Sequence, residues 1–240
     1  MLALEADPTA LEKRLPSGWK LAPYTGDDPR GTSLRGANVI VPFCEVYAVR
    51  SRDGGVEGLQ QLSCVAFVSR ARERATGELA DLHWFAYTED PADVPGKFHD
   101  GVHARIIRSQ TFNKEQQGET CVREAFDALG EDGDVSLSLD YVQGGDLVIW
   151  TTAAEPNTCL RAASDPQIVR WYREDHVMNV IRSDPLSINR VSHLTFDVNG
   201  ELSDVFDGNE RVVAVVVQRP YIRHVFVPDR SVAAPGVQDE

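Results

Sequence analysis

The stretch VSLSLDYVQGGDLVIWTT, residues 135–152, decides the fold class of this chain. Apolar and polar residues alternate on both sides of Gly144-Gly145, which is the pattern of two antiparallel strands joined by a tight turn. The same pattern recurs in HLTFDVNGELSDVF, residues 193–206, around Asn199-Gly200. A further turn at residues 207–209 leads into the apolar run RVVAVVVQ, residues 211–218. The chain is therefore predicted to consist mainly of strands joined by hairpins.

The remaining segments complete a β-dominated layout. Alternating or apolar runs predict further strands at 39–50 (broken at Pro42), 60–70, 81–87, 102–109 and 222–227. Helices are expected at 8–15, opened by Asp7-Pro8, at 120–129 and at 166–182, the last two from apolar residues at helical spacing. We predict an α+β, β-dominated fold in which about ten mostly antiparallel strands form a barrel or curved sandwich with two or three helices.

Composition limits the domain organisation and the partners. The 240 residues suit a single β-rich domain, 1–230, followed by a disordered C-terminal tail, 231–240. The net charge of −13 argues against nucleic acid and anionic membranes, since both need a basic surface. No apolar run reaches the roughly 20 residues that span a bilayer, and the N-terminus lacks a signal-peptide pattern. Four widely spaced cysteines suit a reducing compartment, so we expect the cytoplasm.

Lys97 is the candidate nucleophile of this chain. It lies in Val94-Pro95-Gly96-Lys97-Phe98-His99, among apolar neighbours, and lysine is scarce in the sequence. A lysine in an apolar environment has a lowered pKa and attacks ketones as a free amine, forming a Schiff base. The structural alternative is an exposed loop lysine.

The β-rich layout and the Pro95-Gly96-Lys97 element resemble the acetoacetate decarboxylase-like superfamily, although the Gly-Arg-Glu element of that family is absent. The resemblance implies a curved barrel and a Schiff-base lyase, a decarboxylase or an aldolase-like enzyme, that acts on a small keto acid without a cofactor. It implies Lys97 as the catalytic amine and Glu45 as the carboxylate on a core strand. Residues expected to bind the substrate are Arg35, Arg105, His99 and His176.

The histidines do not predict a metal site. His99 and His103 have an HxxxH spacing, but Gly101 disfavours a helix there, and His83 and His193 are far away in the sequence. No glycine-rich phosphate-binding pattern is present either. Two other functions stay open, namely a cofactor-free barrel that binds a small apolar molecule and a non-catalytic structural subunit. Exposed sheet edges would favour a homo-oligomer.

Overall fold

The computed structural model describes residues 1–26, 34–47, 61–91, 101–114, 120–143, 147–151, 158–164, 169–181, 191–218 and 222–226. This part of the chain contains one helix, α1 (Pro8–Arg14), and a sheet of 15 strands. The strands are β1 (Leu2–Glu5), β2 (Trp19–Leu21), β3 (Val39–Val41), β4 (Phe43–Tyr47), β5 (Gln61–Glu73), β6 (Leu79–Thr88), β7 (Gly101–Lys114), β8 (Thr120–Gly130), β9 (Gly133–Gln143), β10 (Leu147–Thr151), β11 (Thr158–Ala162), β12 (Val169–Ile181), β13 (Val191–Gly200), β14 (Arg211–Gln218) and β15 (Ile222–Phe226).

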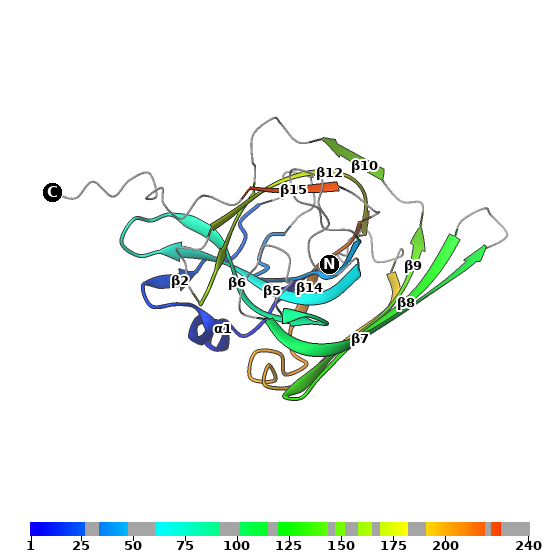
Figure 1. Ribbon diagram of the computed structural model, residues 1–240, viewed down its shortest axis with the longest axis horizontal. Coiled ribbons are helices and arrows are strands. Elements are labelled where there is room, and N and C mark those ends of the chain that lie inside the picture. The colour runs from blue at the N-terminus through cyan, green and yellow to red at the C-terminus, as the bar shows by residue number, and fades with distance from the viewer. Residues whose placement is uncertain are drawn as a thin grey trace.

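Seven of these strands form a closed ring of hydrogen-bonded neighbours. The ring runs β6–β11–β12–β14–β1–β3–β5, and the pairing of β5 with β6 closes it. Every neighbouring pair in the ring is antiparallel except β11 with β6. Figure 1 looks into this ring, with β12 along its top and β5 and β14 below. The predicted β-dominated, mostly antiparallel fold is confirmed, and its barrel-like part is this ring.

An arm of four strands leaves the ring at β6. β7 pairs in parallel with the end of β6, and β8, β9 and β13 follow in antiparallel order. The arm curves away from the ring at the lower right of Figure 1. One face of the arm is concave and looks towards the ring, while the other face looks outwards.

The main hydrophobic core fills the space between the ring and the concave face of the arm. Leu2 of β1 and Phe67 of β5 belong to the same buried cluster as Phe126 of β8 and Leu137 of β9. Phe43 of β4 joins the two sides, because its ring centroid lies 5.2 Å from that of Phe126. Burial of this apolar surface away from water stabilises the packing of the arm against the outside of the ring.

The opposite face of the ring strands looks into the ring. Residues that pair across neighbouring strands share a face, so the interior can be followed through the register. Ala3 pairs with Ala214 and Ile40, Ile40 pairs with Val68, and Val68 pairs with His83. Ala3, Ile40 and Ala214 form a second buried cluster, separate from the main core.

Two of the expected helices are strands. Segment 120–129 lies in β8, which hydrogen-bonds to β7 on one side and to β9 on the other. Its buried residues Val122, Phe126 and Ala128 alternate on the concave face, so the helical spacing of the apolar residues was coincidental. Segment 166–182 contains β12, which pairs with β10, β11, β14 and β15. Pairing with neighbouring strands overrides the local periodicity in both segments.

Two of the expected hairpins are also wrong. Strand β10, which follows Gly144-Gly145, pairs with β12 and not with β9. Residues 201–206 form turns and not a strand, with the amide of Phe206 donating to the carbonyl of Leu202. Leu202 and Phe206 are buried in the main core, and this burial favours the compact turn over an extended strand.

The first helix agrees with its prediction. A carboxylate oxygen of Asp7 accepts a hydrogen bond from the amide of Thr9 at 2.8 Å, and Pro8 occupies the first turn. This is the N-cap arrangement that satisfies an otherwise unpaired amide. No helix in the part of the chain that the structure describes is long and apolar enough to cross a membrane.

Candidate functional site

The candidate site is the interior face of the ring along β5 and β6. At one end, Arg70 of β5 pairs with Asp81 of β6, with a distance of 3.1 Å between Nε and a carboxylate oxygen. The hydroxyl of Tyr24 donates to the same oxygen at 2.9 Å, and the guanidinium lies 4.0 Å from the centre of the Tyr24 ring. Burial alone would lower the pKa of Arg70, but Asp81 and Tyr24 outweigh it and raise the pKa. Arg70 therefore stays a fixed positive charge.

Further along the interior face of β5 and β6, the side chains are first small and then polar. Ala66 pairs with Ala86, and Cys64 pairs with Thr88. His83 lies between this part of the row and the Arg70 group, and only 3% of its surface is exposed. The register places His83 opposite Val68 of β5 and Ala162 of β11. His83 is therefore the candidate general acid or base on this face of the ring.

A second polar group lies outside the ring, between β4 and the arm. The guanidinium of Arg108 on β7 forms ion pairs with Glu45 of β4 and Glu124 of β8. Its Nε donates to Glu124 at 2.8 Å, and Gln110 donates to the other oxygen of Glu124 at 3.3 Å. Burial would lower the pKa of Arg108, but the two carboxylates outweigh it and raise the pKa. We call Glu45, Arg108 and Glu124 the clamp, because they join β4 to the arm.

Tyr141 of β9 borders the clamp on the concave face of the arm. Only 2% of its surface is exposed. Burial, followed by the negative charge of Glu124, raises the pKa of Tyr141 from 10.0 to about 12. The phenol is therefore neutral in the folded protein over the physiological range of pH.

This shift predicts how stability depends on alkaline pH. Because the folded state holds the phenol proton more tightly than the unfolded state, the contribution of Tyr141 is complete below pH 10.0 and is lost as the pH rises through about 12. We expect the free energy of unfolding to fall less steeply across that interval in Tyr141→Phe than in the wild type. Urea unfolding at several pH values measures both slopes. Parallel curves for the two proteins would contradict the prediction.

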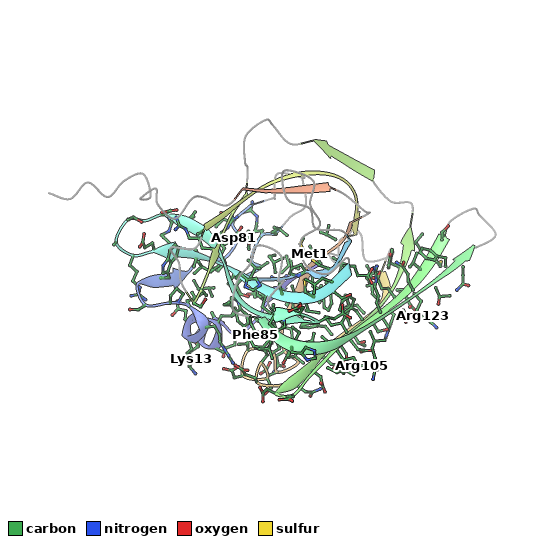
Figure 2. The ribbon with its side chains drawn as sticks, viewed as in Figure 1. Met1, Lys13, Asp81, Phe85, Arg105 and Arg123 are labelled. Atoms are coloured by element: carbon green, nitrogen blue, oxygen red, sulfur yellow. The ribbon has the colours of Figure 1, made fainter. Side chains whose placement is uncertain are left out.

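The structure places the predicted site residues in different regions. Lys97 and His99 lie outside the described residues. Glu45 faces the arm and not the ring interior, and its catalytic role stays a prediction. Arg105 is on the opposite face of β7 from Arg108, on the outer side of the arm, where Figure 2 labels it.

The other two predicted residues lie closer to the ring. Arg35 is exposed in the turn whose neighbours Gly36 and Ala37 hydrogen-bond to the backbone of Tyr24, at the Arg70 end of the ring. His176 is in β12, a strand of the ring, opposite Trp150 of β10. The helical stripe on which it was expected does not exist, and its side chain lies outside the described residues.

Sequence reasoning missed Tyr24, Arg70, Asp81, Arg108 and Glu124. These residues stand in ordinary strand or loop contexts, and each finds its partners across strands or at long sequence separation. Strand alternation around the buried Phe67 could have suggested that Arg70 faces away from the main core. No local signal indicates that this other face lies inside a ring.

Comparisons with known proteins give little further information about the site. No protein-family model matches the chain, and no curated protein matches it. Among solved structures, the chain is similar to the enduracididine biosynthesis enzyme MppR with HEPES buffer bound. The two are 12% identical, the alignment covers 94% of this chain and 79% of that chain, and the TM-score is 0.44. At this identity and TM-score the likeness assigns no family to the chain.

Proposed function

We propose that this protein is an enzyme that binds a small keto acid inside the ring. The observation that carries the proposal is the buried imidazole of His83 on the interior face, opposite Val68 of β5. The two ring nitrogens of an imidazole can donate and accept protons, which suits acid–base catalysis on a bound substrate.

Lys97 is the nucleophile in this proposal. It belongs to the segment that joins Thr88, the last residue of β6, to Gly101, the first residue of β7, and Gly101 pairs with Ala86. The free amine would attack the ketone carbon, and loss of water would leave an iminium. The iminium accepts the electron pair of the bond beyond its α-carbon, so carbon dioxide or an aldehyde leaves and an enamine remains. Protonation of the enamine at carbon and hydrolysis of the resulting iminium release the product and return the lysine amine. The same chemistry serves a decarboxylase and an aldolase.

Reductive trapping tests the proposal directly. The protein is incubated with pyruvate, acetoacetate, oxaloacetate or 2-oxoglutarate in the presence of sodium borohydride, which reduces an iminium to a stable secondary amine. We expect one keto acid to add to the intact mass, with the adduct mapped to Lys97. Lys97→Ala abolishes the adduct, whereas Lys13→Ala, which removes an exposed lysine of α1 (labelled in Figure 2), retains it.

A matched pair of histidine variants tests the role of the ring interior. His83→Gln is expected to slow adduct formation by roughly 10²-fold or more, the usual contribution of a general acid or base. His193→Gln, at an exposed position on the arm, leaves the rate unchanged. Glu45→Gln belongs in the same series, because Glu45 faces the arm and not the ring interior. A slower reaction would support the acid–base role predicted from the sequence, and an unchanged rate would contradict it.

The outcomes separate the candidate functions. A folded protein that gives no adduct with any keto acid contradicts the lyase proposal and favours a barrel that binds an apolar molecule. An adduct that persists in Lys97→Ala contradicts the assignment of the nucleophile. The cytoplasmic location and the homo-oligomer stay predictions from the sequence.

A further inference from the structure

We propose that Cys44 and Cys64 form a reversible disulfide that responds to low-molecular-weight disulfides such as oxidised glutathione. Cys44 lies in β4 and Cys64 in β5, and the register pairs them directly across these antiparallel strands. The two cysteines are not joined by a disulfide in the structure. The inference rests on this pairing and is independent of the proposed keto-acid chemistry.

The register sets a spacing that a disulfide can span. The amide of Ala66 donates to the carbonyl of Pro42 at 3.1 Å, which makes these opposed residues a hydrogen-bonded pair. Hydrogen-bonded and non-hydrogen-bonded pairs alternate along an antiparallel ladder, so the opposed cysteines, two residues further on, also form a hydrogen-bonded pair. Their Cα atoms are then about 5.5 Å apart, within the roughly 4.4–6.8 Å range of natural disulfides. The two strands must draw together slightly for the Cβ atoms to reach the roughly 3.5–4.5 Å spacing that a disulfide needs.

Both side chains point to the same side of the two strands. Neighbouring Phe43 and Val65 face the main core, and strand alternation therefore directs the cysteines to the opposite face, towards the ring interior. Cys64 pairs with Thr88 on that face. A bridge between the cysteines would covalently join β4 to a ring strand within the row that contains His83.

The two thiols differ in access, and this difference suggests the order of the reaction. Cys44 is partly exposed, whereas only 4% of Cys64 is exposed. The thiolate of Cys44 attacks one sulfur of glutathione disulfide and releases one glutathione thiolate. The thiolate of Cys64 then attacks the Cys44 sulfur and displaces the second glutathione. The two protein thiols lose two electrons and two protons, and glutathione disulfide becomes two glutathione molecules.

Cys121 provides a matched internal control. It also lies in a strand, β8, and is partly exposed, but its neighbours in the register are Asn113 of β7 and Val142 of β9. It has a comparable opportunity to react with an oxidant and no cysteine opposite it.

The test is equilibration of the native, fully reduced protein with glutathione disulfide, followed by alkylation with N-ethylmaleimide and non-reducing peptide mapping. We expect two thiols to become unreactive together, a cross-linked peptide that contains Cys44 and Cys64, and full recovery of both thiols after dithiothreitol. Cys121→Ser gives the same cross-link. Cys44→Ser gives none and leaves Cys64 reactive or joined to glutathione.

Three results would overturn the proposal. The first is continued alkylation of both cysteines after equilibration with excess glutathione disulfide. The second is a stable glutathione adduct on Cys44 in the wild type. The third is a cross-link that joins either cysteine to Cys121. The wild-type map alone decides among them, so the conclusion does not depend on whether a serine variant folds.

Discussion

Phe67→Ala is expected to destabilise the protein by about 3–5 kcal/mol. The side chain of Phe67 is fully buried, and its ring centroid lies 5.4 Å from that of Trp84, 6.0 Å from that of Phe85 and 5.5 Å from that of Phe206. These neighbours come from the ring and from the turn that follows β13. Truncation leaves a cavity that they cannot fill together, because they are anchored in different segments. Urea unfolding followed by tryptophan fluorescence measures the loss.

Phe112→Ala is the matched control for this substitution. Phe112 also lies in a strand, β7, but 55% of its surface is exposed. Its truncation removes little buried surface, so the change in the free energy of unfolding should stay within about 0.5 kcal/mol. Equal losses in the two variants would contradict the location of the main core between the ring and the arm.

Gly200→Ala is expected to cost roughly 2–5 kcal/mol, because an added Cβ meets two separate obstacles. Gly200 ends β13 with a φ of 80°, a conformation that L side chains rarely adopt. A Cβ built there would also lie 2.1 Å from the carbonyl oxygen of Asp132 and 2.5 Å from the Cα of Gly133. Both of these close atoms belong to the backbone, so the turn between β8 and β9 would have to move to make room for the Cβ.

Gly208→Ala separates the two causes. Gly208 has a similar φ of 85°, but a Cβ there meets no atom within 4 Å. It should therefore cost only the conformational penalty, about 1–2 kcal/mol. The difference between the two variants in urea unfolding measures the steric cost alone. A Gly200→Ala variant no less stable than Gly208→Ala would contradict the close approach of the β13 end to the β8–β9 turn.

Local sequence was sufficient for most strands and for the first helix. Pro42 separates β3 from β4 as expected, because proline lacks the amide that a continuous ladder needs. The segments around Phe67, Phe85 and Leu137 alternate or are continuously apolar, and each lies in a strand of the structure. Asp7-Pro8 opens α1, because capping and the fixed φ of proline act within a few residues.

The candidate site could not be predicted in the same way. Nothing in the local sequence distinguishes Arg70 and Asp81 from other strand residues. The pairing of β5 with β6 is what brings them together. Arg108 joins Glu124 of the next strand, β8, to Glu45 of β4, which lies 63 residues away along the chain. Lys97, on which the predicted chemistry depends, lies outside the described residues, so its role depends on the trapping experiment.

By itself the sequence determined that this protein is β-dominated and where most of its strands lie, since alternation, turn residues and caps act over a few neighbouring residues. Only the tertiary structure decided that residues 120–129 and 169–181 are strands, that β10 pairs with β12, and that β5 closes a ring with β6. Helical and extended forms of an apolar segment differ little in local energy. Whether such a segment becomes a helix or a strand therefore depends on the hydrogen bonds and the buried apolar surface that distant strands provide.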